Sequence, residues 1–303
     1  IINHFNKWSK ERIIGDVVVS LIRFEWGLFL FHKGTYRDHV LHMLNVYLLG
    51  QFIVEKLNLN IFNHQDRNKT EFTWAVASLL HDVGYVYEKL SEAVRDAFGS
   101  VIQPISTLGE APKIDINSPI MDRYLRLIAK TYETMLEKPQ KQKEALANLR
   151  KGKNSSLDFG LSWNFYRELR EILQQNKRGV HGLVSALITL DNLISKNPYA
   201  KNNYWFREWY PYVLVAATSM ALHSLPTKTL DRFKINEINN PILALLVLCD
   251  EIQDFGRPGT KSSSLNLKDI EPEQQNKGIT IVLESKTKEK IKNLKNKVGQ
   301  ISN

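Results

Sequence analysis

Carboxylate and imidazole side chains stand at the ends of apolar segments in this 303-residue chain. His81 and Asp82 are adjacent and close one such segment, and Asp250 follows the apolar run 241–249. A carboxylate is rarely buried among apolar side chains unless it is paired with a cation or binds a metal. The pattern therefore predicts a shared partner, and a metal ion is an economical one.

Three further histidines, His42, His181 and His223, lie in or at the ends of apolar segments. Mixed imidazole and carboxylate ligands favour Mn, Fe, Ni, Co or Zn over Ca, and Mg only where carboxylates and waters dominate. We therefore predict a site for one or two divalent ions. His39 precedes His42 by three residues, and one of the two could be a core histidine bonded to a carbonyl. We assign the ligand role to His42.

The other assignments also have structural alternatives. Asp250 could form a buried salt bridge with a lysine or arginine. His181 and His223 could be helix-terminal residues whose rings lie in solvent.

The segments that carry these residues are predicted to be helices, because apolar residues recur three and four positions apart. The fold class is therefore expected to be all-α. The predicted helices span residues 38–57, 70–80, 118–138, 140–150, 180–195, 212–222 and 241–255. In the first, one apolar stripe is expected to contain Val40, Leu41, Leu44, Leu48, Phe52 and Leu57.

The order of the candidate ligands along the chain resembles the H…HD…D signature of the HD superfamily of metal-dependent phosphohydrolases. The residues that carry this resemblance are His42, His81, Asp82 and Asp250. His181 and His223 resemble the two further histidines of the dinuclear branches, which include HD-GYP phosphodiesterases and CRISPR-associated HD nucleases. The resemblance covers about residues 36–258. It departs from the HD-GYP pattern, because Gly84 is followed by Tyr85 and Val86 rather than by a clear GYP tripeptide.

The resemblance implies an all-helical HD-domain bundle over residues 1–258. The polar segment 91–178 is interpreted as a helical insertion or cap on that bundle. Residues 259–303 are expected to form a small, basic and partly β appendage, with a short strand at 278–283.

The resemblance also implies hydrolysis of a phosphate ester, by a phosphomonoesterase or phosphodiesterase that uses a metal-activated water on a nucleotide or another phosphate-containing small molecule. His81 and Asp82 would be the catalytic pair. The implied ligands of the first ion are His42, His81, Asp82 and Asp250. Asp82 would bridge to a second ion held by His181 and His223. The basic residues nearest in sequence to these segments, and so the candidates for binding substrate phosphate, are Lys33, Arg37 and Arg257.

Two other functions are compatible with the same residues. One is a degenerate HD module that binds a nucleotide or partner without hydrolysis, although such a module has no chemical need for all four residues of the signature. The other is an HD-type nuclease that uses the basic C-terminal segment. The sequence does not discriminate nucleotide from nucleic acid, and it leaves oligomerisation open.

Composition and charge restrict the cellular compartment and the partners that are expected. No apolar run approaches the 18 or more residues that a membrane span needs, so no membrane partner is expected. No signal peptide is recognised, and the single cysteine, Cys249, fits a reducing cytoplasm. The formal net charge is +9, and residues 257–303 hold 10 basic and 5 acidic residues. That excess suggests an anionic partner, although the lysine-rich pattern favours a solvated helix over a nucleic-acid patch.

Deletion of residues 284–303 should leave metal binding and hydrolysis of small phosphate esters unchanged, because the segment contains no candidate ligand. If the segment binds DNA or RNA, affinity should fall steeply between about 50 and 200 mM salt, and the deletion should flatten that dependence. Titrations of both proteins at two salt concentrations measure this. If the full-length and truncated proteins bind nucleic acid equally weakly, the basic segment gives no support to the nuclease function, and only the candidate metal site would remain as support.

Overall fold

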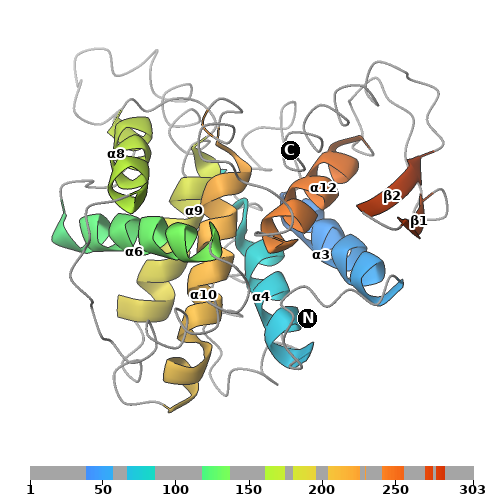
Figure 1. The fold of residues 1–303 in the computed structure, drawn as a ribbon, viewed down its shortest axis with the longest axis horizontal. Helices are drawn as coiled ribbons and strands as arrows, with labels where there is room; N and C mark the ends of the chain where they lie inside the picture. The colour runs from blue at the N-terminus through green and yellow to red at the C-terminus, as the bar shows by residue number, and fades with distance from the viewer. Residues whose placement is uncertain are drawn as a thin grey trace, which may run out of the picture.

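A computed structural model gives the conformation of most of the helical part of the chain. The residues it describes are 39–56, 67–85, 118–136, 161–174, 180–195, 204–225, 229, 241–255, 270–275 and 278–283. Within these ranges the architecture is dominated by helices (Figure 1), which confirms the predicted all-α class. The helices are α3 (His39–Lys56), α4 (Arg67–Leu80), α6 (Pro119–Leu136), α8 (Leu161–Gln174), α9 (His181–Leu190), α10 (Tyr204–His223) and α12 (Pro241–Phe255).

Helices α4 and α10 pack against each other at the centre of the bundle (Figure 1). On one side, α3 packs against α4, α12 packs against both α4 and α10, and α3 and α12 contact each other. On the other side, α9 and α6 pack against α10, and α8 packs against α6. One hydrophobic core joins side chains of all seven helices. The five helices that carry the candidate ligands, or end beside them, are therefore held by the same core.

The segment predicted as an insertion, 91–178, contributes α6 and α8. Tyr124 and Ile128 of α6 and Phe165 of α8 belong to the common core. The division of the chain at 258 and the role of 91–178 as an insertion stay predictions. The helix predicted at 140–150 lies outside the described residues.

Helix α8 was not predicted, whereas the boundaries of the other described helices largely follow the predicted ones, with one large difference. Helix α12 has the predicted bounds, whereas α10 begins at Tyr204 rather than at residue 212. Pro211 lies inside α10. A proline inside a helix removes one backbone hydrogen bond, but this helix continues through it. Helix α9 ends in a π-helical turn, Asp191–Ser195.

The apolar stripe predicted for α3 is wrong as a description of its core face. Leu41, Leu48 and Phe52 remain 50%, 49% and 40% exposed. The buried face contains both histidines of this helix, together with Met43, Val46, Tyr47, Leu49, Gly50 and Ile53. The prediction is wrong because it took the core face from the apolar residues alone, whereas the buried face of α3 also holds two histidines that have partners inside the protein.

Helices α3 and α4 approach closely where a glycine meets a tryptophan. Trp74 of α4 is fully buried, and its indole N–H donates to the carbonyl of Tyr47 in α3 at 3.1 Å. A Cβ on Gly50 would collide with the Trp74 ring. This contact fixes the separation of α3, which carries His42, from α4, which ends at the His81–Asp82 pair.

A two-stranded antiparallel sheet follows the helices, formed by β1 (Ile270–Gln275) and β2 (Gly278–Leu283). The pairing runs from Ile270 opposite Leu283 to Gln275 opposite Gly278. The strand predicted at 278–283 is confirmed as β2. Strand β1 was not predicted, because its sequence is rich in Glu and Gln, which are not typical strand residues.

None of the described helices combines the length and the apolar character needed to cross a membrane.

Replacement of Trp74 by Ala should lower the free energy of unfolding by about 3–5 kcal/mol, because it leaves a cavity between α3 and α4. Urea unfolding measures this loss. Leu48→Ala, on the exposed face of α3, is the matched control and should change stability by no more than about 0.5 kcal/mol. Equal losses in the two variants would contradict the assignment of the core face.

Candidate metal centre

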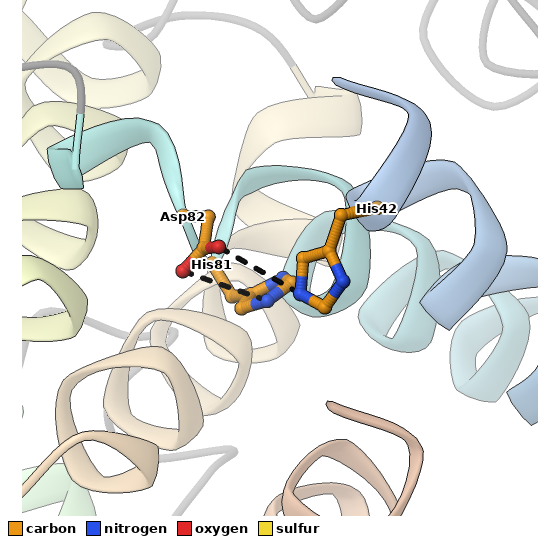
Figure 2. Close-up of side chains that lie close together, drawn as sticks. All are labelled: His42, His81 and Asp82. Carbon is orange, nitrogen blue, oxygen red and sulfur yellow. Dashed lines mark ion pairs between the residues drawn. The ribbon is translucent and has the colours of Figure 1, made fainter. Parts of the chain in front are cut away.

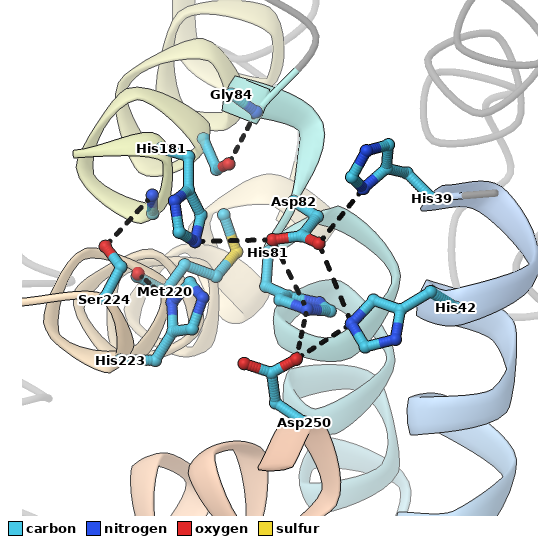
Figure 3. Close-up of polar contacts among 12 residues, drawn as sticks. His39, His42, His81, Asp82, Gly84, His181, Met220, His223, Ser224 and Asp250 are labelled. Atoms are coloured by element: carbon cyan, nitrogen blue, oxygen red, sulfur yellow. Dashed lines mark hydrogen bonds and ion pairs between the residues drawn. The ribbon is translucent and has the colours of Figure 1, made fainter. Parts of the chain in front are cut away.

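The six predicted ligands come together although they are far apart in the sequence. His42 of α3 and Asp250 of α12 lie 208 positions apart and are in direct contact. His81 and Asp82 form the turn that follows α4, and Figure 2 shows both facing His42. The remaining two are supplied by the first residue of α9, His181, and by the last residue of α10, His223 (Figure 3).

His42, His81 and Asp82 have donor atoms at spacings that suit one ion, and Asp250 lies beside both histidines of this group. His42 Nε2 lies 2.8 Å from Asp250 Oδ1, and His81 Nε2 lies 3.6 Å from the same oxygen. Asp82 Oδ2 lies 3.7 Å from His42 Nε2. Metal–ligand bonds of about 2.0–2.1 Å place neighbouring ligand atoms roughly 3.0–3.4 Å apart. The observed distances are close to that range, so small shifts would bring the four atoms onto one ion.

A second group of donors lies on the other side of Asp82. The ligand atoms of Asp82, His181 and His223 all lie within 4.8 Å of one another. Asp82 Oδ1 is 3.5 Å from His181 Nε2, whereas Oδ2 faces His42. The carboxylate thus presents one oxygen to each group, which is the arrangement that a bridging ligand requires.

Two of the histidines are oriented by carbonyls at the ends of their helices. The last carbonyls of a helix have no partner within it. The Nδ1–H of His81 donates to the Ser78 carbonyl at 2.7 Å, and that of His223 donates to the Met220 carbonyl at 2.6 Å. Each bond orients the ring and turns Nε2 toward the centre, as is usual for metal-binding histidines. Both Nε2 atoms are buried and have no hydrogen-bond partner.

These observations test whether a divalent cation fits the site. The donor set is imidazole and carboxylate, and the donor atoms converge. The buried Nε2 atoms of His81 and His223 have no hydrogen-bond partner. Such a set suits Mn, Fe, Co, Ni or Zn. The residues present therefore fit the ion that the sequence predicted.

The charges of the site shift its pKa values in opposite directions. Burial opposes protonation of His81, but the negative charges of Asp82 and Asp250 outweigh it and raise the pKa of His81 to about 9. Burial and the neighbouring imidazoles of His81 and His181 lower the pKa of His223 to about 3. Burial also disfavours both carboxylates, yet the surrounding histidines hold the pKa of each below its usual range. At neutral pH without an ion, both carboxylates are ionised, His223 is neutral and His81 holds a proton.

Burial differs across the site. The side chains of His42 and His81 are almost completely enclosed, whereas those of His181 and Asp250 are 18% and 23% exposed. The centre is therefore open to solvent on the side of His181 and Asp250.

His39 and Tyr85 are the nearby residues that the sequence interpretation missed. His39 is buried, and its Nδ1 lies 3.5 Å from Asp82 Oδ2, so it faces the carboxylate rather than serving as a core histidine bonded to a carbonyl. The Tyr85 ring lies between His39 and His181, with ring centroids 4.6 and 5.2 Å away. The three-residue spacing of His39 and His42 could have placed both on one helix face. The predicted phosphate-binding residues, Lys33, Arg37 and Arg257, lie outside the described residues.

Comparison with family models, with curated proteins and with solved structures gives no match in any of the three. The interpretation of the site therefore rests on its own residues and geometry.

Binding of the first ion should release about one proton near pH 7, because His81 is protonated in the metal-free centre and must lose that proton to become a ligand. Since its pKa is about 9, apparent affinity should rise by up to tenfold per pH unit between pH 6.5 and 8.5. Calorimetric titration with Mn²⁺ in two buffers of different ionisation enthalpy counts the protons. Binding without proton release would show that His81 is not a ligand.

Proposed function

We propose that the chain is a metal-dependent phosphohydrolase of the HD superfamily, acting on a phosphate monoester or diester of a nucleotide or another small molecule. The observation that carries this proposal is a set of three overlapping histidine–carboxylate groups. Two of them share the buried carboxylate of Asp82, and the third joins His81, His223 and Asp250. Two ions bridged by one carboxylate are a recurrent arrangement in enzymes that hydrolyse phosphate esters.

Two independent features agree in support. The order of the ligand types along the chain is that of the HD signature, and the same residues converge in space from separate helices. The order of residues along a chain does not by itself bring them together in space, so the two features support the proposal independently. A degenerate module has no need for the buried Nε2 of His223, which has no hydrogen-bond partner, and this disfavours that alternative.

Each residue has a definable task in this proposal. His42, His81, Asp82 and Asp250 would hold one ion, and Asp82, His181 and His223 a second. When bound, the ions would supply a nucleophilic water at neutral pH and positive charge for the phosphoryl oxygens. The carbonyls of Ser78 and Met220 keep the rings of His81 and His223 turned inward.

The substrate would approach from the side of His181 and Asp250, where the centre is open. The enclosed side, formed by His42 and His81, excludes bulk water and strengthens the electrostatic interactions within the centre. Tyr85 lies between the rings of His39 and His181, both of which face Asp82. Binding of substrate phosphate by Lys33, Arg37 or Arg257 stays a prediction, as do a nucleic-acid substrate and an oligomer.

The test is metal content followed by activity. Purified protein should retain, or bind on addition, Mn²⁺, Ni²⁺, Co²⁺ or Zn²⁺, and should then hydrolyse p-nitrophenyl phosphate, bis(p-nitrophenyl) phosphate or a panel of nucleotides. The first two compounds separate monoesterase from diesterase activity. Failure to bind any of these ions, or metal binding with no hydrolysis across the panel, would overturn the proposal.

Asp82→Ala should abolish hydrolysis with little loss of helix content, because it removes the shared ligand and leaves the apolar core intact. Asp250→Asn should also reduce turnover, by more than the 10–100-fold typical of groups that only support a ligand. Steady-state kinetics and circular dichroism measure the two properties. Glu251→Gln is the matched control, because it neutralises the adjacent carboxylate, which belongs to none of the ligand groups found among the described residues. Equal loss of activity in the control would show that the assignment rests on charge or stability alone.

A further inference from the structure

Two serines tie together the three segments that carry the second group of ligands. The N–H of Gly84 donates to Ser185 Oγ at 2.7 Å, across 101 positions of sequence. The N–H of Gly182 donates to Ser224 Oγ at 3.1 Å. Figure 3 draws both bonds beside the histidine cluster, one starting from Gly84 and the other ending at Ser224.

The sequence positions of these four residues explain why the bonds matter for the site. Gly84 follows Asp82 by two residues, and its partner Ser185 lies one helical turn after His181. Gly182 and Ser224 directly follow His181 and His223, respectively. The first bond therefore links the Asp82 segment to the His181 helix, and the second links that helix to the end of the His223 helix.

Both glycines allow the backbones to touch. A Cβ on Gly84 would collide with the carbonyl of His181 and lie 2.7 Å from the N of Ser185. A Cβ on Gly182 would collide with the carbonyl of Met220 and lie 2.6 Å from His223 Cε1. Any larger residue would push the segments apart, so the glycines permit the approach and the serine hydroxyls hold it.

The bond between Gly182 and Ser224 also caps the start of α9. The first N–H groups of a helix have no partner within it. Val180, which precedes α9, makes no capping bond through its side chain. The N–H of Gly182 is instead satisfied by a hydroxyl from the end of α10. The cap of the helix that carries His181 thus comes from the residue next to His223.

We propose that Ser185 and Ser224 are positioning residues that set the spacing of Asp82, His181 and His223 and thereby determine the affinity for a second ion. The proposal deepens the proposed function and rests on its two-ion centre. Ser224 adjoins His223, which is assigned to the second ion, so the loss of its hydroxyl should affect that ion more than the first.

The same helices provide a matched control. Ser219 is also buried in α10, but its hydroxyl donates to the Val215 carbonyl of its own helix at 3.0 Å. Ser219→Ala removes a buried hydroxyl of the same type five residues from Ser224 without cutting a link between segments. Ser224→Thr retains the hydroxyl and tests rescue.

The experiment is a Mn²⁺ titration of the full chain, with calorimetry for affinity and electron paramagnetic resonance for the spin coupling of two neighbouring ions. Ser224→Ala should weaken the second binding event by about 10–100-fold, the range for residues that orient metal ligands, and weaken the first by less. Ser185→Ala should also weaken the second event by more than the first. The coupled signal should diminish in both variants, persist in Ser219→Ala and return in Ser224→Thr. Thermal unfolding of the metal-free proteins identifies any variant that fails to fold.

The outcomes separate this proposal from the proposed function. Wild-type affinities in both alanine variants, or an equal effect of Ser219→Ala, would overturn the positioning role and leave the function intact. If the wild type binds two ions but hydrolyses no ester, the function is wrong and the positioning role is decided by the affinities. A wild type that binds fewer than two ions would overturn the second group of ligands and the positioning role together.

Discussion

The rest of the site depends on the burial of one carboxylate. Asp82 is 6% exposed, and a carboxylate at such depth requires compensation for the loss of water. One of its oxygens faces His181, and the other faces His39 and His42. Helices α3, α4 and α9 must meet at this point, because each supplies or adjoins part of that compensation. The bundle is therefore organised around a charge as much as around its apolar core.

Helix ends are the second organising feature. His81 and His223 each occupy the end of a helix, where a carbonyl three residues earlier accepts the Nδ1–H. Helix termination is usually a problem of unsatisfied backbone groups. Here the unsatisfied group orients a ligand, so one bond both caps the helix and turns the imidazole toward the centre. The beginning of α9 is also capped by a group next to a ligand, because the Gly182 N–H donates to the hydroxyl of Ser224 at the end of α10.

The sequence predicted the helical class, most helix positions and the six residues that converge, because helical periodicity and the order of ligand types are local properties of the chain. It did not predict the roles of Ser185 and Ser224, because a serine in a helix has the same appearance whether its hydroxyl bonds within that helix or to another. It also misassigned the face of α3 that holds Leu41 and Leu48. Which face is buried depends on partners from α4 and α12, and those partners cannot be read from α3 alone.

The unequal enclosure of the ligands has a consequence for how the centre would exchange its contents. His42 and His81 are sealed within the bundle, whereas His181 and Asp250 reach the surface. Each set of ligands contains a partly exposed member, Asp250 for the first ion and His181 for the second. Each ion of the proposed centre would therefore have its own contact with solvent and could exchange without displacement of the other. The order in which two ions load would then be set by their affinities and not by access.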